Sequence, residues 1–234
     1  MKFLEKCDFH DAIIDGSPIV IGFIPIAMAF GILCKSANLN LMASVSFSLF
    51  VFAGASQFIA VNLLIAGASM GEIILTTLLV NMRHVLFSAS ISPKLSSQMR
   101  KDIPFIAFGL TDETFSVASL KDKELTNSYM LTLEGMAYSS FVIGTFLGYV
   151  LGGILPIIVQ VSMGIALYSL FVAILVPELK KSKKVLVLVV SSGLVNSFLT
   201  KLAHIPQGWS IVITILAVSF LGVIIPLKKE GSNE

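Results

Sequence analysis

Long apolar runs constrain the fold of this chain more than any other feature of its sequence. A helix needs roughly 20 mostly apolar residues to cross a hydrocarbon core about 30 Å thick. The runs of this kind are Gly16–Leu33, Leu41–Ala68, Ile73–Ile91, Leu131–Leu155, Ile157–Val176, Val185–Leu199 and Trp209–Ile225. Ile103–Leu120 is an eighth candidate, with a polar interruption. Because the runs lack the period-two alternation of barrel strands, we predict an all-α polytopic transmembrane helical bundle of about seven spans, with broken or re-entrant segments.

The composition supports the same fold class. Of the 234 residues, 13% are charged, against about 25% in an ordinary globular domain. We predict a single integral membrane domain over residues 1–234, in the inner membrane and with several passes. The net charge of +2 indicates no nucleic-acid partner. Cys7 and Cys34 have neither CxxC nor metal-ligand spacing, so we expect no metal and no cofactor.

Basic residues in the loops indicate how the spans are oriented. The cluster Lys180, Lys181, Lys183 and Lys184 predicts a cytoplasmic loop and a C-terminus inside the cell. The side of the N-terminus stays open, because Ile103–Leu120 either spans the membrane or forms a re-entrant hairpin. The hairpin would put Lys94, Arg100 and Lys101 inside. It would also turn the N-terminus outward, unless another segment is re-entrant too.

Glycine and proline predict helix breaks in two runs. The break expected in the first run involves Pro25, Phe30 and Gly31, with a kink or a packing contact as the alternative. Leu41–Ala68 is longer than a straight span needs at about 1.5 Å per residue, which predicts a break at Gly54–Gln57. Gly54 would adopt a positive φ there, and exposed backbone would contact a bound solute.

Three glycines spaced by four, Gly144, Gly148 and Gly152, share one face of a predicted helix. Such a face lets another helix approach closely. The partner is either another helix of this chain, which we favour, or a second subunit.

Polar side chains inside the apolar runs mark the candidate site. Arg83 and His84 lie near the middle of Ile73–Ile91, and Asn81 shares a helical face with His84. A guanidinium matches the two oxygens of a carboxylate, and an imidazole exchanges protons near neutral pH. The alternative is that the segment ends near Asn81, which would leave Arg83 at the membrane interface.

Two further groups complete the candidate site. The acidic pair Asp112 and Glu113, next to Thr111, would hold an ammonium group or a coupling proton, or would cap a helix. Ser56 and Gln57, beside Gly54, offer uncharged hydrogen-bonding groups, although a buried amide can also bridge two helices. Glu134 is interpreted as an interfacial carboxylate, one turn inside its helix.

Four sequence blocks between Gly16 and Leu120 strongly resemble the AzlC family, the large subunits of branched-chain amino-acid exporters. In chain order they are GFIPIAMAFG, FAGASQF, NMRHVLFSASISP and FGLTDETF. The resemblance implies export of valine, leucine, isoleucine or, in some members, methionine, together with a small membrane partner of the AzlD type. The block members carried over from the resemblance are Phe30, Gly31, Gly54, Ser56, Gln57, Asn81, Arg83, His84, Thr111, Asp112 and Glu113.

The resulting hypothesis is a secondary exporter of branched-chain amino acids in the lipid bilayer. We assign substrate binding to Gly54, Ser56, Gln57, Asn81, Arg83 and Thr111, and proton coupling to His84, Asp112 and Glu113. Protons are the default energy source, because no GxxxxGK[ST] loop for ATP occurs. The rival hypotheses are a non-transporting membrane scaffold and an intramembrane enzyme, although no HExxH motif occurs and the serines are scattered.

Overall fold

A computed structural model describes residues 2–96, 101–121, 124–156, 182–201 and 203–224, with scattered positions between 158 and 180. Its regular elements are α1 (Lys2–Ser36), α2 (Leu41–Phe50), α3 (Gly54–Ile65), α4 (Met70–Ile91), the 3-10 turn η1 (Ser92–Lys94), α5 (Ile103–Gly109), α6 (Asp112–Ser119), α7 (Asn127–Leu151), α9 (Lys183–Lys201) and α10 (Gln207–Ile224). The predicted helical membrane fold is confirmed, because α1, α4, α7, α9 and α10 are long and apolar enough to span a membrane. Half of the predicted span Ile157–Val176 lies outside the described residues.

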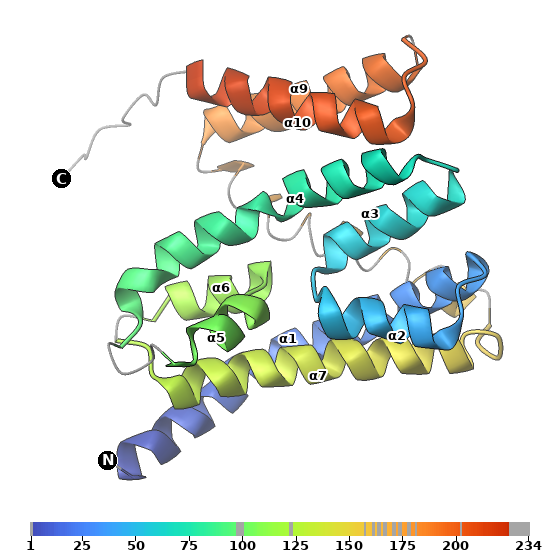
Figure 1. The fold of residues 1–234 in the computed structure, drawn as a ribbon. Helices are drawn as coiled ribbons and strands as arrows, with labels where there is room; N and C mark the ends of the chain where they lie inside the picture. The colour runs from blue at the N-terminus through green and yellow to red at the C-terminus, as the bar shows by residue number, and fades with distance from the viewer. Residues whose placement is uncertain are drawn as a thin grey trace. The chain divides into compact units, whose positions relative to one another are not determined.

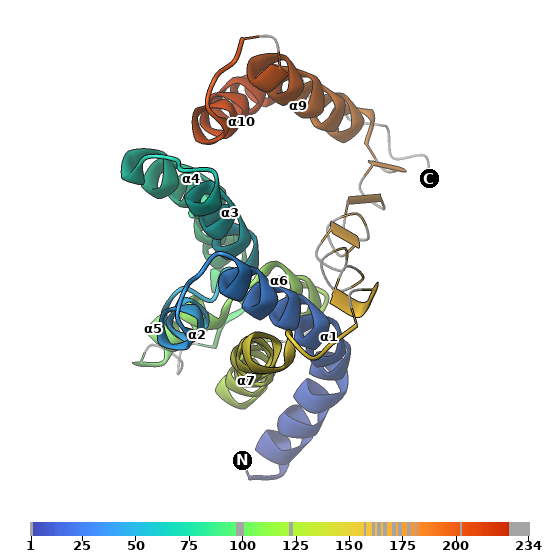
Figure 2. The same cartoon turned by 90° about the vertical axis from the view of Figure 1, so that its right-hand side faces the viewer.

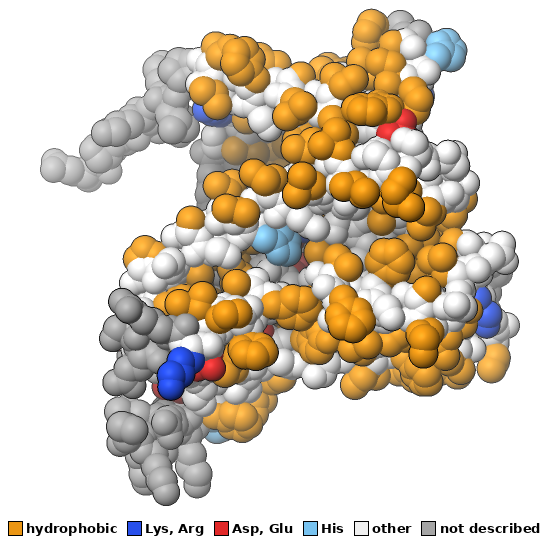
Figure 3. All heavy atoms as spheres, viewed as in Figure 1, with side chains coloured by type: hydrophobic (Ala, Val, Ile, Leu, Met, Phe, Trp, Pro, Cys, Tyr) orange, Lys and Arg blue, Asp and Glu red, His pale blue; other side chains and the backbone are white. Residues whose placement is uncertain are grey.

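The chain divides into two compact units. Unit 1 comprises Met1–Asn62 and Val80–Tyr168, and unit 2 comprises Leu63–Leu79 and Ser169–Glu234. On the face drawn in Figure 3, hydrophobic side chains cover much of the described surface and charged ones are few. A surface of this kind is stable in lipid rather than in water. Whether the two units act as one transporter domain stays a prediction.

Helices α1 and α7 form the centre of unit 1, where they lie side by side and parallel (Figures 1 and 2). The contacts advance in the same direction along both helices, because Gly16 faces Leu133 and Gly31 faces Thr145. A Cβ on Gly148 would lie 2.1 Å from the carbonyl oxygen of Met28, a distance that no real side chain tolerates. The two backbones therefore touch.

This seam settles two predictions about glycine. Close packing through Gly144, Gly148 and Gly152 is confirmed, and the partner is α1 of the same chain. The predicted break in the first run is wrong, because α1 continues as one helix through Pro25, Phe30 and Gly31. Gly31 serves close packing instead, since a Cβ there would lie 2.2 Å from the Thr145 carbonyl oxygen. The Phe30 side chain is fully buried beside it.

The run Leu41–Ala68 forms a helix pair, α2 and α3, rather than one straight helix. The Tyr149 hydroxyl donates to the Leu39 carbonyl oxygen at 2.8 Å, and the Tyr138 hydroxyl donates to that of Leu49 at 3.0 Å. Helix α2 therefore runs from the C-terminal end of α7 towards its middle, opposite in direction to α7.

Helix α3 then returns towards the end at which α2 began. The ring of Phe47 on α2 and the ring of Phe58 on α3 both contact Phe30, with centroids 6.1 Å and 5.4 Å away. Between them, the Phe52 ring contacts Phe23, two turns earlier on α1. Helices α2 and α3 thus both pass Phe30 of α1, and the turn between them reaches further along α1, to Phe23. The two helices therefore form a re-entrant hairpin.

Helices α5 and α6 form a second hairpin, which enters from the opposite end of α7 (Figure 1). At its start, the Asn127 amide donates to the Asp102 carboxylate. At its finish, the Lys94 ammonium donates to the carbonyl oxygens of Ser119 and Lys121, at 2.6 and 2.9 Å. Both ends of the hairpin therefore lie near the first residues of α7. Of the two possibilities for Ile103–Leu120, a membrane span or a re-entrant hairpin, the structure has the hairpin.

Unit 2 packs α9 and α10 together with the first half of α4. The Ser210 hydroxyl on α10 donates to the side-chain oxygen of Asn196 on α9, at 2.7 Å. The Thr76 hydroxyl on α4 donates to the Gly208 carbonyl oxygen at 3.3 Å. Hydroxyl and amide groups thus join helices whose outer surfaces are apolar.

Candidate functional site

An ion pair between α4 and α6 lies at the centre of the candidate site. An Arg83 guanidinium nitrogen lies 2.9 Å from an Asp112 carboxylate oxygen, and both side chains are mostly buried. Helix α4 continues to Ile91. The alternative that this segment ends near Asn81 is therefore wrong. Within an apolar segment, each charge of the pair makes the other tolerable.

The N-terminus of α6 presents the acidic residues of the site. Thr111 is the N-cap: its hydroxyl accepts from the Thr114 N–H at 3.3 Å, and the Thr114 hydroxyl accepts from the Thr111 N–H at 2.8 Å. Asp112 and Glu113 occupy the first helical turn, where the partial positive charge of the helix favours carboxylates. Thr111 therefore caps α6, as expected of this segment, and both carboxylates lie next to the tip of the second hairpin, where α5 turns into α6.

Two polar atoms on α4, in residues within two positions of Arg83, have no hydrogen-bond partner in the described part of the chain. They are the Asn81 side-chain oxygen and the His84 Nε2, and both are buried. Buried polar atoms normally bond to protein or water, so these are available to a solute or to water. The His84 ring lies 5.9 Å from that of Phe87, which stacks on Phe115 of α6 at 4.6 Å. Aromatic stacking and the ion pair thus hold α4 and α6 together.

The first hairpin closes its break with its own polar groups. The Ala53 N–H donates to the Gln57 side-chain oxygen at 3.1 Å, and the Ser56 hydroxyl donates to the Ala53 carbonyl oxygen at 3.0 Å. The Gln57 amide donates to Ser48 at 3.4 Å, and Ser48 bonds Thr145 of α7 at 2.7 Å. The Gln57 side chain therefore bridges α3 to the residues before it, as the alternative interpretation expected. A direct contact of Gln57 with substrate stays a prediction.

The break itself lies three residues earlier than expected. Helix α2 ends at Phe50 and α3 begins at Gly54. The positive φ belongs to Phe52, at 43°, and not to Gly54. The Phe52 side chain is 2% exposed, and burial of its ring offsets the cost of about 1–2 kcal/mol for this backbone conformation. The predicted role of Gly54 at positive φ is wrong.

Aromatic rings join the tips of the two hairpins. The Phe52 ring of the first tip lies 6.2 Å from that of Phe108 in the second, and Tyr138 of α7 contacts both, at 5.2 and 5.8 Å. The helices that begin next to these tips are α3 and α6, and their N-termini attract negative charge. Unit 1 thus contains the predicted groups of site residues. An ion pair joins Arg83 to Asp112, and aromatic contacts join the tips of the two hairpins.

Glu134 is a residue whose importance the sequence interpretation missed. It is 3% exposed rather than interfacial, and both of its carboxyl oxygens are buried without a hydrogen-bond partner among the described residues. Its side chain packs on Gly109 at the second tip, where a Cβ would lie 2.7 Å from the Glu134 Cβ. A signal was present, because Glu134 lies among Met130, Leu133 and Ala137 on the apolar stripe of α7.

Known proteins resemble this chain in sequence. The family described as AzlC protein matches residues 18–155, which is more than half of the chain. The chain belongs to the AzlC family. The match includes both hairpins, α4 and α7. No solved structure matches the chain.

Relatives of this AzlC family member come from several organisms. The inner membrane protein YgaZ of Escherichia coli is 33% identical over 79% of this chain and 76% of its own length. An uncharacterized membrane protein of Archaeoglobus fulgidus is 35% identical over 74% of the chain and 76% of its own length. The branched-chain amino acid transport protein AzlC of Bacillus subtilis is 25% identical over 91% of the chain and 82% of its own length. The AzlC family member described here is a multi-pass protein of the cell membrane.

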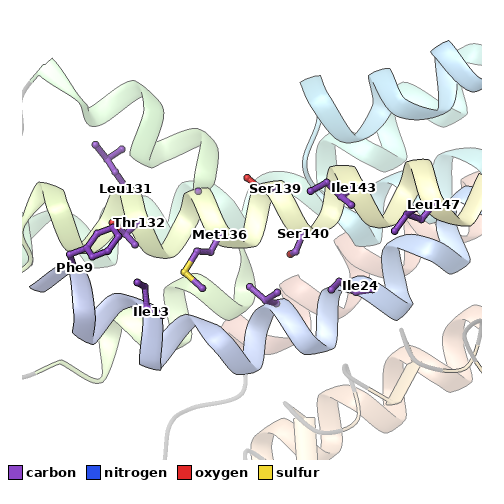
Figure 4. A pocket seen from close by; sticks show the side chains of 12 residues that line it. Phe9, Ile13, Ile24, Leu131, Thr132, Met136, Ser139, Ser140, Ile143 and Leu147 are labelled. Carbon is purple, nitrogen blue, oxygen red and sulfur yellow. The ribbon is translucent and has the colours of Figure 1, made fainter.

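A shallow groove of about 710 Å³ runs between α1 and α7 (Figure 4), and none of the residues assigned to the candidate site lines it. Its lining is apolar apart from small hydroxyls such as Ser139 and Ser140, and it carries no charged side chain. It offers no group that would hold a zwitterion. Nor do the described residues gather three or more His, Cys, Asp or Glu side chains that could hold a metal ion.

One short motif bears on the enzyme alternative. The residues Gly67-Ala-Ser-Met-Gly71 have the GxSxG spacing found around the nucleophilic serine of hydrolases. In those enzymes the serine lies on a sharp turn between a strand and a helix. Here Ser69 follows α3 and caps α4: its hydroxyl accepts from the Glu72 N–H at 3.4 Å, and its own N–H donates to the Glu72 carboxylate at 3.3 Å. The motif is therefore a helix cap in a turn between helices.

Proposed function

We propose that this protein is a secondary transporter that exports branched-chain amino acids across the inner membrane, coupled to protons and assembled with a small AzlD-type membrane subunit. The observation that carries the proposal is the pair of hairpins that enter unit 1 from opposite ends and meet at Phe52 and Phe108. Transporters commonly bind solutes where interrupted helices end inside the membrane. The Bacillus subtilis relative, named a branched-chain amino acid transport protein, supports the substrate class.

The Arg83–Asp112 pair suits a zwitterion. In the structure, the two side chains neutralise each other at 2.9 Å. An amino acid that enters between them gives its carboxylate to Arg83 and its ammonium to Asp112, so every charge stays paired. Asn81 stays in the proposed site because its buried side-chain oxygen, on the His84 face of α4, has no partner in the described part of the chain and is available to a solute. Thr111, Ser56 and Gln57 remain part of the proposed site through their side-chain hydrogen bonds at the starts of α6 and α3.

The aromatic cluster of Phe52, Phe108 and Tyr138 suits the other end of a branched-chain amino acid. Its rings lie 5.2–6.2 Å apart at the hairpin tips. Apolar rings contact a leucine or isoleucine side chain favourably, while a charged side chain would lose its hydration there. The site thereby favours amino acids with large apolar side chains.

For proton coupling, we propose the titratable groups next to the ion pair: His84, Asp112 and Glu113. His84→Gln and the double variant Asp112→Asn/Glu113→Gln test this assignment separately. We expect at least one of them to remove the pH dependence of export. Export that keeps its full pH dependence in both would exclude these three residues from coupling.

The rival functions have less support. A scaffold that assembles through the glycine face would need that face to be available, whereas α1 of the same chain covers it. The only GxSxG motif caps a helix. A transporter is therefore favoured over both alternatives.

The direct test is leucine transport in proteoliposomes, with and without the small subunit. We expect saturable efflux of labelled leucine that valine and isoleucine inhibit, that glutamate does not inhibit, and that an inward proton gradient accelerates. Efflux no faster than from protein-free liposomes, in both preparations, would refute the proposed function.

A further inference from the structure

A buried carboxyl group of α7 lies against the tip of the second hairpin. Glu134 is 3% exposed, and its Oε2 lies 2.7 Å from the position that a Cβ on Gly109 would occupy. Gly109 is the last residue of α5, two residues before the cap of α6. The backbone of the tip therefore packs directly on this carboxyl group, and only a glycine leaves room for it.

Neither oxygen of Glu134 has a hydrogen-bond partner in the described part of the chain. Two cations of unit 1 are paired with other carboxylates: Arg83 pairs with Asp112 at 2.9 Å, and Lys121 pairs with Asp15 at 2.6 Å. A lone carboxylate charge in an apolar interior is very costly. The enclosed Glu134 side chain is therefore neutral, with a proton on one oxygen.

Titratable groups on the helices that pack against α7 leave Glu134 isolated. Helices α2 and α5 contain none. Helix α6 contributes Asp112, in its ion pair, and Glu113. The described side chains of α1 are grouped at its two ends, with Asp8, His10, Asp11 and Asp15 near the start and Cys34 and Lys35 near the finish. Helix α7 itself adds Tyr129, Tyr138 and Tyr149.

We propose that Glu134 is a proton-binding site of the transport cycle, coupled to the position of the α5–α6 tip. With its proton bound, the tip packs on α7 as in the structure. When the tip moves away, water reaches the carboxyl group, the proton leaves to that water, and the charged side chain prevents the tip from returning. The proton leaves while the site is open to the cytoplasm. The tip returns only after leucine has moved the opening to the outside and Glu134 has taken up a proton there, so each exported leucine brings one proton in. This inference rests on the proposed transport function.

Glu134→Gln tests the proposal, because glutamine has the same shape as a protonated glutamate and cannot release a proton. One pH unit across the membrane corresponds to about 1.4 kcal/mol per proton, so coupling to one proton sustains an about tenfold leucine concentration ratio. We expect the wild type to reach this ratio. We expect Glu134→Gln to permit downhill efflux and to sustain no ratio.

Glu72→Gln is the matched control. Glu72 is also buried, at 5% exposure, but its carboxylate accepts from the Ser69 N–H, so we expect the full ratio. If Glu134→Gln does not insert into the membrane, Glu134→Asp decides, because it still binds a proton: a sustained ratio supports the proposal, and downhill efflux without a ratio contradicts it.

The outcomes separate this inference from the proposed function. No leucine movement by the wild type would refute transport itself. Wild-type transport that ignores the pH gradient would refute the role of Glu134 and leave transport standing. A tenfold ratio maintained by Glu134→Gln would refute the role of Glu134 alone.

Discussion

Arg83 shows what a single side chain contributes to this fold and what sequence alone reveals of it. A permanent positive charge in the middle of an apolar run predicts a buried partner. The sequence also marks Asp112 as functional, but it does not pair the two, because they lie in different elements and pairing depends on the hairpin. For Glu134 the sequence interpretation failed, since one carboxylate near a helix start is more often interfacial than buried.

Replacement of Arg83 is expected to disable leucine binding while the protein still inserts. Hydrogen bonds to charged groups contribute about 1.5–3 kcal/mol, so Arg83→Gln should weaken apparent leucine affinity by about tenfold or more. Arg83→Lys should also be impaired, because lysine lacks the bidentate fork. Leucine titrations of transport rate measure both. Lys35→Gln, at the far end of α1, serves as the control, and wild-type affinity in Arg83→Gln would contradict the assignment.

Gln57 is expected to matter for the stability of the first hairpin. Gln57→Ala leaves the buried Ala53 N–H without its acceptor, which costs about 1–3 kcal/mol. Gly54→Ala is the comparison, because its new Cβ would meet the Phe141 ring at an ordinary 3.5 Å. Thermal melting of the purified variants measures the difference. Equal melting temperatures for the two variants would show that the Gln57 bonds do not hold the tip.

At the scale of the elements, length and apolarity predict which segments are helical, and backbone contact decides where they break. The long run Leu41–Ala68 was expected to be interrupted, and it is, at Val51–Ala53. The first run was expected to break at Pro25 and Gly31, yet α7 packs along it and α1 stays continuous. Glycine marks both situations in a sequence, and only the neighbouring helix distinguishes them.

The seam between α1 and α7 is expected to tolerate no side chain at Gly148. A Cβ there would lie 2.1 Å from the Met28 carbonyl oxygen, so Gly148→Ala must separate the helices at a cost of about 1–3 kcal/mol or more. Gly135→Ala on the same helix is the matched control, because its Cβ would meet nothing within 4 Å. Folding yield and melting temperature should fall for Gly148→Ala only. If both variants match the wild type, the two backbones are not in contact.

At the scale of unit 1, two re-entrant hairpins allow the basic loop residues and the N-terminus to lie on the same side of the membrane. One hairpin alone would have turned the N-terminus outward. With α2–α3 and α5–α6 both re-entrant, the starts of α1 and α7 lie at the same end as Lys94, Lys101 and Lys121, and Lys35 lies at the other. The positive-inside rule then predicts that the N-terminus is cytoplasmic.

Cysteine labelling tests this orientation. In a variant without Cys7 and Cys34, a membrane-impermeant maleimide added to intact cells should label Asn38→Cys and leave Lys101→Cys unlabelled. Opened cells should label both. Labelling of Lys101→Cys in intact cells would place the charged end of unit 1 outside and contradict the orientation.

The central claim is that a zwitterionic branched-chain amino acid binds between Arg83 and Asp112. Equilibrium binding of labelled leucine to the purified protein, with analogues as competitors, tests it most directly. We predict saturable binding with competition by valine and isoleucine, and none by leucinamide, which lacks the carboxylate, or by 4-methylpentanoate, which lacks the ammonium group. Competition by both analogues as strong as that by leucine, or no saturable leucine binding, would contradict the account.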